Sequence, residues 1–148
     1  MAGVVSYPCH HYLPSNFLSF VLHTGITPIL QVIRAVLYDD GDKESRVWLI
    51  DTNKTEHDIL CREELDTLNQ LYKSDRFVLH HTVTVGKAPQ LWKYSTGRIS
   101  DQMLAAYLPP ASEHSLILTC GPERLIQSTV KPGLQRLGWD ITKDMVVF

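Results

Sequence analysis

Two short segments of the sequence carry residue types that suit the binding of a phosphate-bearing ligand. A turn that ends a strand and opens a helix directs unpaired backbone N–H groups, and the positive end of the helix dipole, toward one point. Such turns favour a diphosphate, although they are also common in proteins that bind no ligand. The segments are Thr24-Gly25-Ile26-Thr27-Pro28, after the apolar run 17–22, and Cys120-Gly121-Pro122-Glu123, after the apolar run 115–119.

Cys120 carries the most reactive side chain of these two turns. Nucleophilic catalysis by a thiol needs an adjacent base, and His114 precedes the strand, so that it is expected at the opposite end. A cysteine at the end of a strand is more often a small buried hydrophobic residue. We therefore expect Cys120 to shape a binding surface rather than to attack a substrate.

Short apolar runs alternate with helical patterns from residue 17 onward, which predicts an α/β fold. We expect a doubly wound, Rossmann-like sheet of five parallel strands in the order 3-2-1-4-5. Ligands bind such sheets at the carboxyl ends of the strands, where the strand order reverses, so both turns would face one ligand. The expected strands are residues 17–22, 47–51, 76–85, 115–120 and 144–148.

The expected helices begin at recognisable capping signals and lie between these strands. Thr27 and Pro28 open the first helix, and Thr55 and Asp58 stand at capping-box spacing before the second. Pro132 is expected to bend the last helix. Residues 1–16 show no periodicity, so we expect an irregular lead-in before one domain at residues 17–148. The expected helices are residues 27–38, 55–71, 100–107 and 122–138.

The composition excludes several classes of protein. The 14 Lys and Arg are scattered and the net charge is −2, so no nucleic-acid-binding face is expected. The three cysteines, Cys9, Cys61 and Cys120, fit neither a disulfide framework nor a zinc site, which favours a cytoplasmic protein. His10-His11 has no third ligand nearby, so no metal site is predicted. No apolar run reaches the ~18 residues of a membrane span, so no membrane association is expected.

Several longer segments occur in an order that is typical of one family. Residues 23–37 read HTGITPILQVIRAVL, residues 53–65 read NKTEHDILCREEL, and WKYS, LPP, CGP and a final Phe148 follow. These segments resemble the NAD(P)H-binding domain of the nitrate reductase and NADH-cytochrome b5 reductase flavoproteins, which are ferredoxin-NADP reductase-like. The resemblance extends from residue 23 to residue 148.

The resemblance implies a domain that binds NADH or NADPH and places it for hydride transfer to FAD. Residues Thr24 to Pro28 would line the pyrophosphate and nicotinamide. Cys120 would lie against the nicotinamide and help to place its C4 atom, which makes it the candidate catalytic residue. Gly121 and Pro122 would shape that wall, and the matched segments make Asn53 and Glu123 further candidate cofactor contacts.

Three details resemble fungal-type nitrate reductase more than the reductases: Thr82-Val83-Thr84, Gly97-Arg98-Ile99 and Leu137-Gly138-Trp139. The reductases have an aspartate in the first segment, where a carboxylate accepts a hydrogen bond from the ribose 2′-OH and repels a 2′-phosphate. Residues 84–86 contain no carboxylate, and Arg98 stands where the reductases have phenylalanine. A guanidinium binds phosphate well, so we predict a preference for NADPH. The alternative is that Arg98 is a solvated surface arginine.

The sequence also departs from the family. His23 replaces the first glycine of the motif, and no flavin-binding segment precedes it. The resemblance therefore implies that FAD is held by a domain that this chain lacks, with a heme domain or cytochrome b5 as the downstream acceptor. Three alternatives remain: a cytochrome b5 reductase module, a non-catalytic remnant that binds a nucleotide or a partner, and an unrelated doubly wound domain. The last would need an acidic cluster at the strand ends, which Asp51 alone does not supply.

Overall fold

The computed structural model describes residues 17–22, 25–85 and 91–148. The expected lead-in at residues 1–16, together with His23 and Thr24, lies outside the described residues. Within them, no helix is long and apolar enough to cross a membrane.

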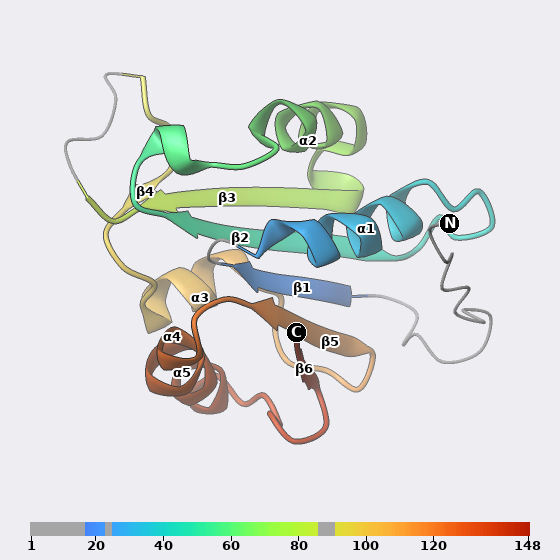
Figure 1. The fold of residues 1–148 in the computed structure, drawn as a ribbon. Coiled ribbons are helices and arrows are strands. Elements are labelled where there is room, and N and C mark those ends of the chain that lie inside the picture. The colour runs from blue at the N-terminus through green and yellow to red at the C-terminus, as the bar shows by residue number, and fades with distance from the viewer. Residues whose placement is uncertain (1–16, 23–24, 86–90) are drawn as a thin grey trace, which may run out of the picture.

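The centre of the molecule is a six-stranded sheet in which every pair of neighbours is parallel. The strand order is β4-β3-β2-β1-β5-β6, and the strands run side by side in Figure 1. The expected α/β class with parallel strands is therefore confirmed. The strands are β1 (Phe17–Leu22), β2 (Arg46–Asn53), β3 (Phe77–Val83), β4 (Ser95–Thr96), β5 (Ser115–Cys120) and β6 (Met145–Val147).

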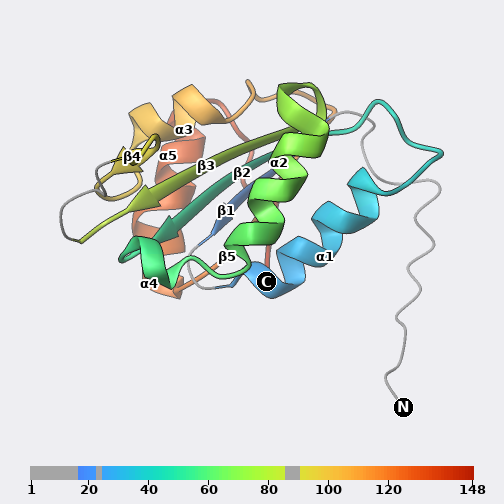
Figure 2. The ribbon, with the colours of Figure 1, turned by 90° about the horizontal axis from the view of Figure 1, so that it is seen from above.

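Helices cover both faces of the sheet, as Figure 2 shows. On one face lie α1 (Ile26–Leu37) and α2 (Arg62–Arg76); on the other lie α3 (Asp101–Tyr107) and a helix formed by α4 (Glu123–Leu125), the π-helical turn η2 (Ile126–Val130) and α5 (Lys131–Arg136). Alternate residues of each strand face opposite sides. Leu49 and Leu79 therefore belong to the core beneath α1 and α2, whereas Ile50 and Ile117 belong to the core beneath α3 and α5.

The sixth strand, β4, was not among the five expected strands. Its two residues pair with Thr82 and Val83 at the end of β3. The pairing is held by Gly97, whose N–H donates to the Val83 carbonyl at 2.8 Å and whose carbonyl accepts from the Thr82 hydroxyl at 2.8 Å. A strand this short has no alternation of apolar and polar residues, so the sequence pattern does not reveal it.

Two helix starts also differ from the expected positions. Gly25, and not Thr27, is the N-cap of α1. The capping box of Thr55 and Asp58 is present, but it caps the single 3₁₀ turn η1 (Glu56–Asp58). The helix α2 begins only at Arg62, because Ile59 is extended and Cys61 has φ of 54°, outside the helical region.

The last helix contains the irregularity expected near Pro132. Pro132 has no N–H with which to bond the carbonyl four residues earlier. The π-helical turn Ile126–Val130 directly precedes it, and the Lys131 N–H bonds the Ile126 carbonyl. The helix ends as expected at Gly138, which has φ of 87° and donates its N–H to the Gln135 carbonyl at 3.0 Å.

Candidate functional site

The two turns singled out from the sequence meet at the centre of the sheet. β1 and β5 are neighbours, with Leu22 opposite Cys120. A Cβ atom placed on Gly25 would lie 2.2 Å from the Cys120 Sγ, 3.0 Å from its Cβ and 3.4 Å from its carbonyl carbon. Gly25 has φ of −111°, a value that any residue can adopt. A glycine is therefore needed here because a side chain would not fit, and not because of the backbone conformation. The structure thus brings Gly25 and Cys120 into direct contact.

The first of these turns leaves the N-terminus of α1 available to a ligand. Gly25 has no side chain with which to cap the helix, and the first turn contains no acidic residue. The helix has twelve residues, so its dipole and free N–H groups favour an anion at this end. Ile26 is buried in the core and anchors the turn, while Thr27 is exposed and Pro28 is partly exposed.

The second turn, residues 120–123, lies on the other side of the contact between Gly25 and Cys120. Cys120 is a free thiol, partly exposed and packed against the core beneath α1. Gly121 is partly exposed, and Pro122 and Glu123 are exposed. The Glu123 carboxylate accepts a hydrogen bond from the Gln127 side chain at 2.6 Å, so it is held along its own helix. Among the described residues, no side chain forms a hydrogen bond with the Cys120 thiol.

Asn53 does not face the solvent. It is 3% exposed, and its side-chain amide donates to the Asp51 carboxylate at 2.8 Å. The same carboxylate oxygen is 2.9 Å from the His81 Nδ1, and His81 is fully buried. The Asp51–His81–Asn53 network is buried, and the His81 ring lies against the rings of Trp92 and Tyr94. Sequence reasoning missed His81, although residues 51, 53 and 81 share one face of neighbouring strands by simple alternation.

His80, the neighbour of His81, faces the opposite side of the sheet. Its ring stacks on Tyr107 with centroids 3.4 Å apart, and its Nε2 shares a hydrogen bond with the Ser95 hydroxyl at 2.8 Å. Burial, with a smaller effect of His81, lowers the pKa of His80 to about 4. A neutral His80 therefore ties β3 to α3 and to β4, next to the loop that carries Arg98.

Arg98 lies at the carboxyl edge of the sheet beside the end of β3. It is exposed and follows Gly97, which has φ of 101° and is bound to β3 on both sides. Among the described residues, Arg98 makes no ion pair or side-chain hydrogen bond. By contrast, Arg34 and Arg136 each form two hydrogen bonds with a carboxylate. The guanidinium of Arg98 is thus left for solvent or for a ligand.

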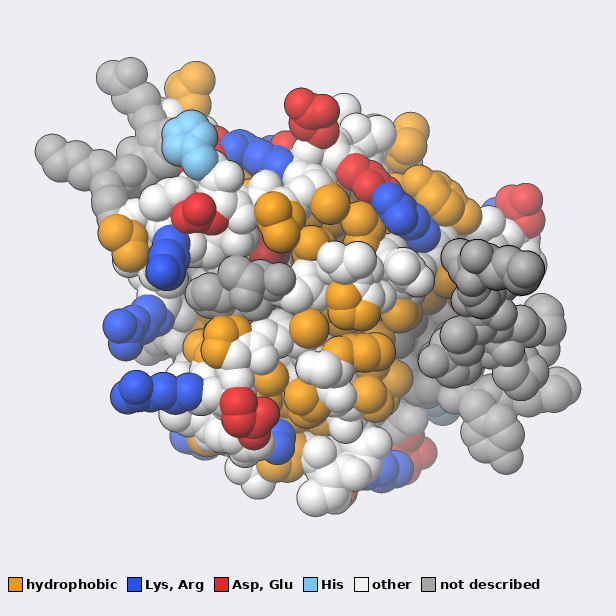
Figure 3. Space-filling model, viewed as in Figure 1, with side chains coloured by type: hydrophobic (Ala, Val, Ile, Leu, Met, Phe, Trp, Pro, Cys, Tyr) orange, Lys and Arg blue, Asp and Glu red, His pale blue; other side chains and the backbone are white. Residues whose placement is uncertain are grey.

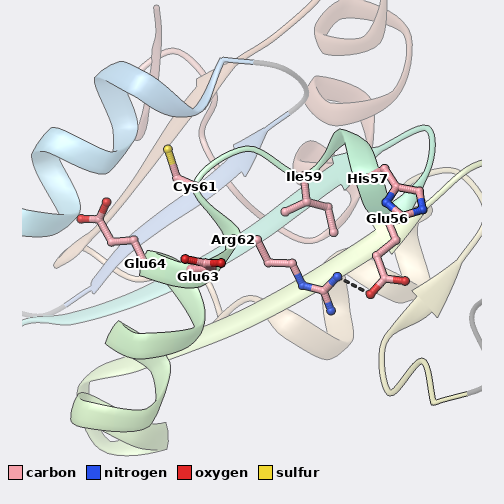
Figure 4. A pocket seen from close by; sticks show the side chains of 7 residues that line it. All are labelled: Glu56, His57, Ile59, Cys61, Arg62, Glu63 and Glu64. Atoms are coloured by element: carbon pink, nitrogen blue, oxygen red, sulfur yellow. Dashed lines mark hydrogen bonds and ion pairs between the residues drawn. The ribbon is translucent and has the colours of Figure 1, made fainter.

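A surface pocket that the sequence did not indicate lies at the start of α2 (Figure 4). Arg62 points toward Glu56 and forms an ion pair with it, and Arg62 also lies 3.6 Å from Asp66. Because its arginine is already neutralised and three glutamates surround it, this pocket does not suit a diphosphate. Its lining residues are Glu56, His57, Ile59, Cys61, Arg62, Glu63 and Glu64.

Comparisons with known proteins show which family the chain is similar to. The family model of the oxidoreductase NAD-binding domain matches residues 24–131. The NAD(P)H nitrate reductase of Hordeum vulgare is 40% identical over 126 residues, which covers 84% of this chain and 14% of that protein. NADH-cytochrome b5 reductase 3 of Rattus norvegicus is 48% identical over 115 residues, which covers 78% of this chain and 37% of that protein.

A solved structure shows the same arrangement of elements. The cytochrome b5 reductase domain of Ulva prolifera nitrate reductase superposes with a TM-score of 0.81 at 30% identity, covering 90% of this chain and 48% of that chain. The chain therefore spans less than half the length of each of these relatives.

Proposed function

We propose that this chain, which belongs to the oxidoreductase NAD-binding domain family, positions NADH or NADPH for hydride transfer to FAD held by another domain. The contact between Gly25 and Cys120 carries the proposal. It joins the turn before α1 to the turn after β5, so that one dinucleotide contacts both. The lack of a side chain at Gly25 leaves room for the Cys120 side chain, so the two turns come together at one place.

The chain's own residues bind and orient the nucleotide. The N-terminus of α1, with Gly25, Thr27 and Pro28, receives the diphosphate through backbone N–H groups and the helix dipole. Cys120 and Gly121 form the wall against which the nicotinamide rests. When bound, the nucleotide supplies a hydride, so the protein contributes mainly orientation. Because Asn53 is buried beside Asp51, its role in this proposal is to support the loop before η1 rather than to contact the cofactor.

The proposal extends to the enzyme in which the domain works. We infer a nitrate reductase with an FAD domain and a heme domain, or a cytochrome b5 reductase with cytochrome b5 as acceptor. The similarity to nitrate reductase of barley and to a cytochrome b5 reductase of rat supports both assignments. A cytoplasmic location is also proposed, supported by the free thiols of Cys61 and Cys120.

Titration of the purified chain with NADH and NADPH, followed by tryptophan fluorescence, tests the central proposal. Saturable binding of either nucleotide is expected. A mixture with a separately produced FAD domain is then expected to reduce ferricyanide. No binding up to millimolar nucleotide would contradict the proposal and favour the non-catalytic remnant.

A preference for NADPH depends on Arg98, the exposed guanidinium at the end of β3. Replacement of Arg98 by Phe is expected to weaken NADPH binding by about tenfold, the order of one charge-assisted hydrogen bond, and to leave NADH binding unchanged. Arg46→Gln, an exposed arginine at the start of β2 and so at the opposite edge of the sheet, is the matched control. An unchanged ratio of the two dissociation constants in Arg98→Phe would show that Arg98 is only a solvated surface residue.

A further inference from the structure

The side chain of Trp92 connects the start of α2 to the strand β4 at the carboxyl edge of the sheet. Its indole N–H donates to the Ser95 carbonyl at 2.9 Å, and the Arg62 guanidinium lies over its ring, 5.8 Å from the centre. The ring also meets Tyr94 edge to face, with centroids 5.3 Å apart. Because Trp92 is partly exposed, these contacts fix its orientation more than burial does.

Two carboxylates orient Arg62. It forms an ion pair with Glu56 of η1, and its Nε lies 3.6 Å from the Asp66 carboxylate. Figure 4 shows the guanidinium pointing toward Glu56. A guanidinium that is paired with carboxylates keeps a fixed orientation, and a cation over the face of a tryptophan is attracted to the ring. Arg62 therefore ties Trp92 to the first turn of α2.

Ser95, which accepts the hydrogen bond from Trp92, begins the strand that leads to Arg98. Its hydroxyl shares a hydrogen bond with the His80 Nε2 at 2.8 Å. Two residues later, Gly97 bonds the end of β3 through its N–H and through its carbonyl. The position of Arg98, which is the next residue, therefore depends on how β4 is held.

The strand β4 has little backbone pairing of its own. Its register with β3 consists of two residue pairs, whereas strands are usually about 3–10 residues long. A segment with few backbone hydrogen bonds opens at a low cost in free energy. The side-chain contacts that His80 and Trp92 make with Ser95 therefore supply part of the placement of β4.

Lys and Arg side chains project from the edge at which the strands end, on the left of Figure 3, and positive charge there favours a phosphorylated ligand. Arg98 is exposed at this edge, beside the end of β3. A guanidinium binds phosphate through paired hydrogen bonds of specific geometry, and a shift of about an ångström at a binding site is costly. A small displacement of β4 would therefore matter more for a nucleotide with a 2′-phosphate than for one without.

We propose that Trp92 is a positioning residue for nucleotide selection, because it ties the strand that presents Arg98 to Arg62 of α2. The inference rests on the proposed function, in which Arg98 binds the 2′-phosphate of NADPH. Trp92 acts through Arg98 and does not itself select the nucleotide. Loss of its indole N–H, or of the guanidinium over its ring, lets β4 shift, so NADPH binding weakens while NADH binding is nearly unchanged.

Two variants loosen this connection in different ways. Trp92→Phe keeps an aromatic ring but cannot donate to Ser95, and Arg62→Gln removes the cation from the ring. Isothermal titration calorimetry of the purified chain gives the dissociation constants of NADPH and NADH, and urea midpoints show whether each variant is folded. Each variant is expected to lower the preference for NADPH by about threefold or more, the order of a weakened hydrogen bond. Arg62→Lys, which keeps a cation near Glu56, should retain more of the preference than Arg62→Gln.

Arg34→Gln is the matched control for Arg62→Gln. Arg34 pairs with Glu64 in the first turn of α2, so this variant loses the same charge and an ion pair on the same helix but leaves the cation over the Trp92 ring. Its preference for NADPH is expected to equal that of wild type. An equal fall in Arg34→Gln and Arg62→Gln would show that only the net charge matters, and would overturn the proposal.

A double-mutant cycle shows whether Trp92 acts through Arg98. In the Arg98→Phe background, Trp92→Phe is expected to change the preference no further, because the effects of residues that act through one another are not additive. An additional fall of the same size in that background would overturn the proposal. An unchanged preference in Trp92→Phe alone, or an equal weakening of both nucleotides in it, would do the same.

The proposed function would fail in a different way. No binding of either nucleotide by the wild-type chain contradicts the function itself and overturns the inference with it. An unchanged preference in Arg98→Phe alone contradicts the role of Arg98 in selecting NADPH, and the inference again falls with it. A lowered preference in Arg98→Phe together with an unchanged one in Trp92→Phe overturns the inference and leaves the function standing.

Discussion

At the scale of single residues, the tightest packing in the site is at Gly25, where there is no room for a side chain. In Gly25→Ala, the new Cβ would lie 2.2 Å from the Cys120 Sγ, so the Cys120 side chain or the two turns must shift. We expect nucleotide affinity to fall by about tenfold or more, since displacements of an ångström at a binding site are costly. Fluorescence titration measures the change. Cys120→Ala removes the nearest atom, so the double variant should regain part of the affinity.

Gly41→Ala is the control for this pair, because a Cβ at Gly41 meets only the exposed Asp39 carboxylate at 3.2 Å. Its nucleotide affinity is expected to equal that of wild type. If Gly25→Ala also binds with wild-type affinity, the two turns do not share a ligand.

His80 gives the protein a predictable sensitivity to acid. The pKa of His80 in the folded protein is about 4, below the value of 6.5 for an unperturbed histidine. Between these values the unfolded chain binds a proton that the folded protein does not, so stability falls as the pH falls from 6.5 toward 4. His80→Phe keeps a ring against Tyr107 but cannot titrate. Urea unfolding at several pH values should show a shallower loss of stability for this variant.

Gln135→Ala supplies the comparison for this pH series, because Gln135 is exposed and its side chain does not titrate. This variant is expected to keep the slope of the wild-type protein. Equal slopes for wild type and His80→Phe would show that His80 is not a source of acid sensitivity.

At the scale of secondary-structure elements, α3 and α5 approach so closely that Gly133 has no room for a side chain. An added Cβ would lie 2.7 Å from the Leu104 Cδ1 and 2.9 Å from an Asp101 carboxylate oxygen. Leu104 is fully buried and Asp101 is held by Arg136, so neither yields freely. Gly133→Ala should lower the free energy of unfolding by about 1–3 kcal/mol, the usual cost of overpacking.

Chemical denaturation measures this change, with Gln135→Ala on the exposed side of the same helix as control. Because alanine favours a helix over glycine by about 1 kcal/mol, a stabilised Gly133→Ala variant would show that the two helices separate at little cost.

The same elements show what the sequence could predict. The apolar runs that form β1, β2, β3, β5 and β6 are recognisable in the sequence. Ser100, the N-cap of α3, and Gly138, which follows α5 with a positive φ, are residue types that favour the ends of helices. The start of α2 was placed too early, because the capping box of Thr55 serves a single turn. β4 and the Asp51–His81 pair depend on contacts between residues distant in sequence. No local pattern encodes such contacts.

At the scale of the whole molecule, the free energy of unfolding should depend on the nucleotide, because the nucleotide bridges the two turns that meet at Gly25 and Cys120. We call this meeting point the corner. The two turns belong to β1 and β5, which come from distant parts of the chain and pair at the centre of the sheet. A dinucleotide that contacts both turns binds the folded chain and not the unfolded one. At a nucleotide concentration 100 times its dissociation constant, the free energy of unfolding should rise by about 2.7 kcal/mol.

Thermal unfolding with and without NADH or NADPH measures this linkage, and the nucleotide that binds more tightly should raise the transition temperature more. The Gly25→Ala variant, whose affinity is expected to be about tenfold lower because of its clash with Cys120, should show about half of the increase or less, about 1.4 kcal/mol, at the same concentrations. Gly133→Ala, which is expected to be about 1–3 kcal/mol less stable but leaves the contact of Gly25 with Cys120 intact, should keep the full increase. A full increase in Gly25→Ala would place the nucleotide elsewhere on the molecule, since stabilisation through the two turns requires both of them to hold the same ligand.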